Sequence, residues 1–113
     1  MLITKQDFQL LEEVLFAIEE SSGISRKFFI KKRTKTALAI LLRQIAIYML
    51  RNQGGFGVAE IGHLVGGYHH STIIHNIKKM EQMIQFPNMY KKEMAMYNEV
   101  MKEYNGQQDQ EVI

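Results

Sequence analysis

A polar stripe that carries no acid runs along the segment EIGHLVGGYHHSTIIHNIKKM, residues 60–80. Its members recur every three or four residues, the spacing of one face of an α-helix: Thr72, His75, Asn76 and Lys79. A face with hydrogen-bonding groups and positive charge suits an approach to phosphates and base edges. A solvated face that happens to lack acids would show the same spacing, so spacing alone leaves both interpretations open.

Histidine and serine side chains in this segment also suggest metal binding or nucleophilic catalysis. His70 and His75 are five residues apart and face different ways on a helix, with no acid near them, which disfavours a zinc site. Ser71 and His75 lack a third group that would orient the histidine, and a serine that opens a helix usually caps it. We therefore expect no enzymatic activity, no metal and no cofactor.

The elements that position the polar stripe read as a helix-turn-helix. A first helix begins at Val58 and ends at Gly66-Gly67, because glycine enters turn conformations at little cost. Residues 68–70 form the turn, and Ser71 or His70 opens the second helix, where a hydroxyl can accept from free backbone N–H groups. The second helix has one apolar stripe: Ile73, Ile77, Met80 and Ile84.

Charge is distributed unevenly along the chain, although the net charge is only +2. Residues 21–80 contain ten Lys or Arg and one acid, whereas the segments before and after them are net acidic. A basic middle between acidic ends is the electrostatic pattern of a protein that binds a polyanion. Six of the basic residues fall within ten positions, around an apolar trio at residues 28–30: Arg26, Lys27, Lys31, Lys32, Arg33 and Lys35. We interpret residues 21–33 as a basic loop that the trio anchors to the core; a membrane-surface segment or a solvated charge run is the alternative.

The remaining elements predict an all-α fold of about five helices around a long central helix. A first helix is expected from Lys5 to Ser21, and a last helix from Met89 to Tyr104. The central helix, residues 34–52, is apolar nearly all round and should be buried by its neighbours. Arg43 within it would reach the surface or pair with an acid such as Glu60, and residues 105–113 would form a disordered tail.

Length and composition indicate one domain, residues 1–113, in the cytoplasm and near the nucleoid. There is no cysteine, which excludes disulfides and thiolate chemistry. The N-terminus carries acids where a signal peptide needs basic and then apolar residues, and the longest apolar stretch is too short to span a bilayer.

Two strings of this sequence resemble the C-terminal DNA-binding domain, domain IV, of the bacterial replication initiator family DnaA. RQIAIYM, residues 43–49, is similar to the family's RQIAMYL, and EIG at 60–62 followed by GGYHHSTIIH at 66–75 is similar to EIG and GGRDHTTVLH. The spacing between the two strings agrees without a gap, and the resemblance covers about residues 5–104. It implies an all-helical, TrpR-like domain that binds double-stranded DNA and acts in replication initiation or its regulation.

The resemblance implies which residues would contact DNA. The second helix of the motif would enter the major groove and the basic loop would reach the minor groove. Residues at the start of this helix would contact bases: Tyr68, His69, His70, Ser71, Thr72 and His75. Basic residues would contact the DNA backbone: Lys31, Lys32, Arg33, Lys35, Arg51, Lys78 and Lys79. Tyr68-His69 replaces the family's Arg-Asp pair, which removes an acid that can accept from cytosine, so the preferred DNA sequence should change.

A protein–protein adaptor is the alternative function. Eight methionines, five of them within residues 80–96, could form a face that adapts to an initiator protein or to a second copy of the chain. No GxxxxGK[ST] loop is present, so this chain has no ATPase module of its own. We expect the basic loop and the Thr72–His75–Lys79 stripe to share one surface if DNA is the partner, and to diverge if the adaptor interpretation holds.

Overall fold

The computed structural model describes residues 4–111, which form six α-helices and no strand. Three long helices dominate the fold: α1 at Lys5–Ser22, α3 at Ala37–Gly54 and α6 at Lys91–Glu111. The helix-turn-helix consists of α4 at Val58–Leu64 and α5 at His70–Gln85. The all-α prediction is confirmed. The remaining helix, α2 at Arg26–Phe29, is short and lies within the basic stretch.

Local sequence explains where the long helices begin and end. The Thr4 hydroxyl accepts from the backbone N–H of Asp7, and the Asp7 carboxylate accepts from that of Thr4, so the start of α1 is a capping box. Helix α3 begins three residues later than predicted, and the Thr36 hydroxyl caps it by accepting from Ala39 N–H. Gly23 and Gly55 end α1 and α3 in the left-handed conformation.

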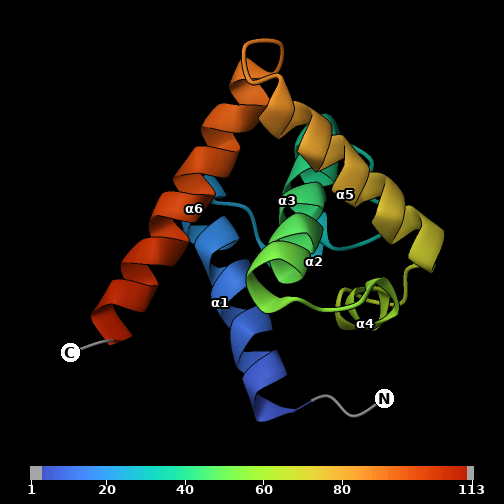
Figure 1. The fold of residues 1–113 in the computed structure, drawn as a ribbon, viewed down its shortest axis with the longest axis vertical. Helices are drawn as coiled ribbons and strands as arrows, with labels where there is room; N and C mark the ends of the chain where they lie inside the picture. The colour runs from blue at the N-terminus through green and yellow to red at the C-terminus, as the bar shows by residue number, and fades with distance from the viewer. Residues whose placement is uncertain (1–3, 112–113) are drawn as a thin grey trace.

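Helix α3 lies at the centre and contacts α1, α2, α4 and α5. Figure 1 shows α6 and α5 descending from one apex on either side of α3, with α1 beside α6 and α4 below the start of α5. The predicted burial of the central helix is confirmed, because its largest apolar side chains are fully enclosed: Leu42, Ile45, Ile47, Met49 and Leu50. On α1, Phe8 is 54% exposed although it is apolar.

The last helix differs from prediction at both ends. It begins at Lys91, because Phe86 to Tyr90 form a turn whose carbonyls accept from Met89 N–H and Tyr90 N–H. It continues to Glu111, so the expected tail is helical over residues 105–111, while residues 112–113 lie outside the described part. The physical reason is packing on α1: Tyr104 is buried, and the Gln108 amide donates to the Glu13 carboxylate.

No helix within residues 4–111 combines the length and the apolarity that crossing a bilayer requires.

Candidate nucleic-acid interface

The turn between α4 and α5 is closed by backbone hydrogen bonds onto Gly62. The N–H groups of Gly67 and Tyr68 both donate to the Gly62 carbonyl, at 2.7 and 3.0 Å. Gly66 and Gly67 have φ angles of 109° and 87°, a region that L side chains rarely adopt. Gly62 itself leaves no room for a side chain, since a Cβ there would stand 2.4 Å from the Tyr68 carbonyl oxygen. The turn is therefore tight and fixed relative to α4.

Helix α5 begins with a histidine cap in place of the predicted hydroxyl cap. His69 is the N-cap, and its Nδ1 accepts from the backbone N–H of Ser71 at 3.1 Å. The Ser71 hydroxyl lies 2.7 Å from the same nitrogen, so it supports the cap but does not itself form it. The His69 and His70 rings stack at 4.2 Å between centroids. Of the two predicted starting residues, His70 is the first helical residue.

The two faces of α5 are clearly separated. Its buried side chains are Ile73, Asn76, Met80 and Met83, and the exposed side of its first half carries six others: His70, Ser71, Thr72, Ile74, His75 and Lys78. Asn76, which the sequence placed on the polar stripe, is buried and donates from Nδ2 to the Thr72 carbonyl. Ile74 is 37% exposed among these polar residues. Ile74 was not among the predicted site residues, because it belongs to neither the polar stripe nor the apolar stripe of this helix.

The prediction of a loop over residues 21–33 was wrong in part, because residues 26–29 form α2. From here on, the basic loop means the connection from α2 to α3, residues 31–36, and a buried arginine binds its backbone. Arg43 of α3 donates from its guanidinium to three backbone carbonyls: that of Phe29 at 3.0 Å, that of Lys31 at 2.5 Å and that of Thr34 at 2.8 Å. The prediction that Arg43 reaches the surface or pairs with Glu60 was wrong, because Glu60 instead accepts from Gly57 N–H at the start of α4. Of the apolar trio, Phe29 is fully buried and Ile30 half-buried, whereas Phe28 is 45% exposed.

The basic loop is also joined to the turn before α5. Lys32 donates from Nζ to the Gly67 carbonyl at 2.6 Å, and the Tyr68 hydroxyl donates to the Ile30 carbonyl at 2.6 Å. Burial raises the pKa of the Tyr68 hydroxyl, and the nearby Arg43 charge opposes that shift. These contacts place the beginning of the loop directly against the helix-turn-helix.

The end of the basic loop lies beside the middle of α5. The loop leads into Ala37 and Leu38 of α3, which line one groove together with Lys79 and Met83 of α5. Figure 1 shows the connection from α2 to α3 passing behind α5 along this side. The end of the loop thus lies on the side of α5 that carries Lys79.

The predicted site residues fall into one main group with one outlier. The group comprises the basic loop, the turn and the exposed side of α5. Arg51 lies apart at the other end of α3, where it donates to the Phe56 carbonyl at 2.8 Å beside the start of α4. Lys79 is half-buried, with its ammonium 5.0 Å from the Tyr90 ring centroid. Lys31, Arg33, Lys35 and Lys78 are exposed.

Residues 11–80 match the family model described as "Bacterial dnaA protein helix-turn-helix", which covers more than half of the chain. The chain belongs to this DnaA family. The family resemblance and the helix-turn-helix class are thereby confirmed, and they link the chain to DNA binding and replication initiation.

Three DnaA relatives illustrate the similarity; each is described as "Chromosomal replication initiator protein DnaA". The protein of Citrifermentans bemidjiense is 45% identical over 60 residues, which are 53% of this chain and 13% of the relative. That of Thermomicrobium roseum is 41% identical over 46 residues, 41% of this chain and 10% of the relative. That of Chloroflexus aurantiacus is 25% identical over 95 residues, 84% of this chain and 20% of the relative. The chain therefore spans about a tenth to a fifth of these relatives, and no solved structure matches it.

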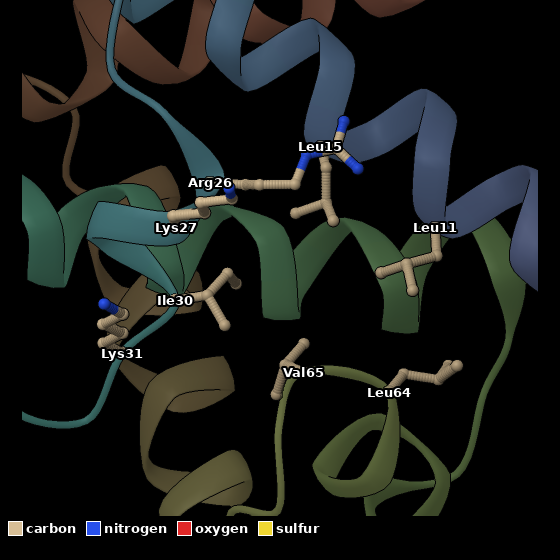
Figure 2. A pocket seen from close by; sticks show the side chains of 8 residues that line it. All are labelled: Leu11, Leu15, Arg26, Lys27, Ile30, Lys31, Leu64 and Val65. Carbon is tan, nitrogen blue, oxygen red and sulfur yellow. The ribbon is translucent and has the colours of Figure 1, made fainter.

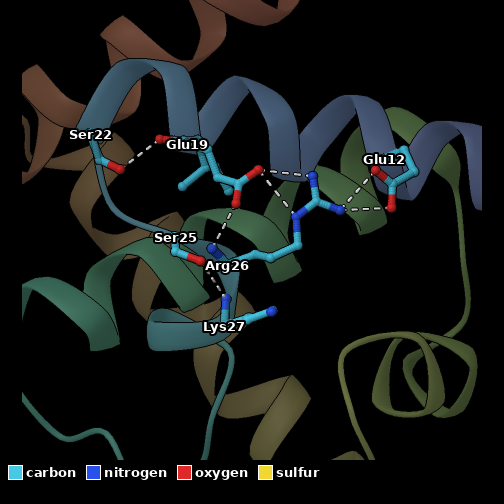
Figure 3. A network of polar contacts seen from close by, with 7 residues as sticks. Glu12, Glu19, Ser22, Ser25, Arg26 and Lys27 are labelled. Atoms are coloured by element: carbon cyan, nitrogen blue, oxygen red, sulfur yellow. Dashed lines mark hydrogen bonds and ion pairs between the residues drawn. The ribbon is translucent and has the colours of Figure 1, made fainter.

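Arg26 belongs to the basic stretch in sequence but to the acidic helix in space. Its guanidinium forms ion pairs with Glu12 at 2.7 Å and with Glu19 at 2.9 Å, both on α1 (Figure 3). The hydrogen bond from Arg26 holds the pKa of the Glu19 carboxyl below its usual value. This DnaA domain thus neutralises one of its six clustered cations internally, which the sequence did not reveal.

A small apolar pocket of about 320 Å³ lies between α1, α2 and the end of α4. Figure 2 shows Leu11 and Leu15 on one side, Leu64 and Val65 on the other, and Ile30 between them. Lys31 stands at its edge, so the pocket borders the start of the basic loop. Within residues 4–111, no group of three or more His, Cys, Asp or Glu side chains could hold a metal ion.

Proposed function

We propose that this chain binds double-stranded DNA without catalysis, with the first half of α5 in the major groove and the basic loop at the adjacent minor groove. The observation that carries the proposal is the pair of contacts, Lys32 to Gly67 and Tyr68 to Ile30, that sets the basic loop beside α5. An α-helix fits the major groove, and many DNA-binding domains combine such a helix with a basic segment that contacts the backbone or the minor groove.

The residues divide by the contacts they can make. His70, Thr72 and His75 are exposed on α5 and carry groups that can exchange hydrogen bonds with base edges. Ile74 would contact thymine methyl groups on the same side. Lys31, Arg33, Lys35 and Lys78 would hold phosphates. Lys32, Arg51 and His69 already have hydrogen-bond partners within the chain, so we assign them mainly to positioning.

We further propose a role at the sites where replication starts, either in initiation or in its regulation, in the DNA-associated cytoplasm. The support is the name of the relatives, which are chromosomal replication initiator proteins. The preferred sequence should differ from theirs, because His69 stands where the family motif has an acid and its ring nitrogen is engaged by Ser71.

Fluorescence anisotropy with a DnaA-box duplex and a scrambled duplex, across a salt series, tests the proposal. About four phosphate contacts give a log–log salt slope of about −4. A steep slope with either duplex supports DNA binding, and the ratio of the two affinities reports sequence preference. Absence of binding to both duplexes at low salt would overturn the proposal.

Alanine substitutions at two exposed residues of α5 should affect DNA binding in different ways. Lys78→Ala should weaken binding to both duplexes alike and reduce the salt slope by about one, because a phosphate contact is lost. Thr72→Ala should leave the slope unchanged and lower the preference for one duplex, since a base contact is worth about 1–3 kcal/mol. Lys102→Ala on α6 is the matched control and should change neither quantity.

A protein–protein adaptor that binds an initiator or a second copy is the second candidate. The favouring observation is an open groove of about 550 Å³ between α3, α5 and α6, which includes Met83 and Met96 and has Lys79 and Lys92 at its edge. Methionine side chains adapt to varied partner surfaces. Sedimentation of the protein alone and with purified initiator, without DNA, decides whether this groove is used; Met96→Glu should abolish any complex.

A further inference from the structure

Tyr68 lies at a junction of three segments that are distant in sequence. Its hydroxyl donates to the Ile30 carbonyl, at the end of α2, over 2.6 Å. Its ring has the Lys32 ammonium 5.0 Å from its centroid and the Arg43 guanidinium carbon 5.7 Å from it. We call this set the Tyr68 junction: Ile30, Lys32, Arg43, Gly67 and Tyr68.

The Tyr68 junction connects every part of the candidate interface. Arg43 binds the carbonyls of the loop from below, and Lys32 binds the Gly67 carbonyl from the loop side. The Tyr68 ring lies close to both cations, and Tyr68 directly precedes the His69 cap of α5. Movement of the start of the basic loop away from the turn before α5 would break the hydroxyl bond to Ile30, the ammonium bond to Gly67, or both.

We propose that Tyr68 is a positioning residue that holds the basic loop in register with α5, so that loop and helix engage DNA as one rigid surface. The proposal rests on the proposed DNA binding and replaces the direct DNA contact that the sequence suggested for Tyr68. The chemistry supports this role, since a phenol hydroxyl already donating to a carbonyl over 2.6 Å would have to give up that bond to donate to DNA. A loop ordered before binding also avoids the entropy cost of ordering it on the DNA.

Hydrogen exchange of the free protein provides the first test. Tyr68→Phe keeps the ring beside the two cations and removes only the hydrogen bond to the Ile30 carbonyl. We expect the amides of residues 31–36 to exchange about tenfold faster in this variant, while those of α1 and α6 are unchanged. Tyr97→Phe is the matched control, because Tyr97 is half-buried on α6, where its ring packs on Tyr48. Unchanged exchange in the loop of Tyr68→Phe would overturn the proposal.

Chemical footprinting of the bound DNA provides the second test. Hydroxyl radicals report the minor groove, where the loop would lie, and methylation of guanine N7 reports the major groove, where α5 would lie. Tyr68→Phe should lose minor-groove protection at a protein concentration that still protects guanine N7. A variant damaged only in its stability, or one that lost a direct contact of α5, would lose both protections together.

The two tests separate failure of this inference from failure of the proposed function. If the native protein protects no DNA, the proposed function fails, and the exchange result still decides whether Tyr68 orders the loop. If the native protein protects both grooves and Tyr68→Phe matches it in both experiments, the positioning role fails while DNA binding stands. Lys32→Gln, which removes the second tie, should reproduce the loss of minor-groove protection.

Discussion

Arg43 places a positive charge beneath the basic loop, where one guanidinium serves three backbone carbonyls. The planar fork of arginine can donate in several directions at once, whereas a lysine ammonium is a single point donor. Its burial is therefore stabilised by the loop, and the loop conformation is stabilised by Arg43. These hydrogen bonds to the loop explain why a buried cation is tolerated in a helix that is otherwise apolar nearly all round.

Replacement of Arg43 should destabilise the fold more than any surface substitution. Arg43→Met leaves three carbonyls without this donor, and we expect the free energy of unfolding to fall by about 3 kcal/mol. Arg43→Lys should recover only part of the loss. Arg51→Met is the control: it removes a donor to one carbonyl, that of Phe56, from an exposed site, and should cost about 0.5 kcal/mol. Urea unfolding measures all three, and equal losses for Arg43→Met and Arg51→Met would contradict the assignment.

At the scale of the element, the start of α5 depends on a side chain that the sequence did not identify as a cap. The free N–H groups at a helix start need acceptors, and the Nδ1 of His69 supplies one to Ser71. Because this end of α5 would face DNA, the cap also fixes the orientation of the exposed residues that follow it. Loss of the cap should therefore affect both the stability of this helix end and the sequence preference of DNA binding.

Two substitutions at His69 should have different effects on stability: His69→Ala should lower it, and His69→Asp should not. His69→Ala removes the cap and should lower the free energy of unfolding by about 1 kcal/mol, or the melting temperature by about 4 °C. His69→Asp restores a capping acceptor and adds a negative charge at the helix start, so it should equal or exceed the native stability. His70→Ala changes a residue that stacks on His69 without capping and serves as the control. Thermal unfolding by circular dichroism measures the order; an equal loss at both positions would refute the cap.

At the scale of the whole molecule, opposite charges are sorted onto different surfaces. Helix α1 carries acids, and it removes Arg26 from the basic cluster by pairing it with Glu12 and Glu19. The cations of the loop and of the exposed side of α5 remain solvent-accessible, with no ion pair among the described residues. The modest net charge therefore conceals one surface suited to a polyanion and one that would repel it.

The ion pair between Glu19 and Arg26 should make stability fall in acid. Its hydrogen bond lowers the pKa of Glu19 in the folded protein below the reference value of 4.5, so the stabilisation is present above that pH and is lost as pH falls through the folded pKa. Glu19→Gln should cost about 1 kcal/mol at pH 7, and the difference from the native protein should shrink below about pH 4. Glu20→Gln, a neighbouring exposed acid, is the control. Urea midpoints from pH 3 to 7 measure the effect, and a difference that persists unchanged at pH 3 would contradict it.

Local sequence determined the helix-turn-helix, the basic stretch and the buried central helix. These features follow from periodicity, from capping residues such as Thr4 and from the two glycines of the turn, all of which act over a few residues. The family strings added which segments would meet DNA, and the family match confirmed the class. Interactions between neighbours in sequence are thus readable without a structure.

Only the tertiary structure decided how individual side chains are used. Arg26 and Arg43 look alike in sequence, yet one pairs with α1 and the other holds the basic loop. Tyr68 looked like a DNA contact but bonds a carbonyl 38 positions earlier, and Asn76 turned inward from the polar stripe. The continuation of α6 to Glu111 likewise depends on packing against α1. For the two arginines, Tyr68 and Gln108 the physical reason is the same: a polar group is paired with whichever partner folding brings within hydrogen-bond distance, and these partners lie 7 to 95 positions away in the sequence. Asn76 pairs locally with Thr72, and its burial depends on which face of α5 packs on the core.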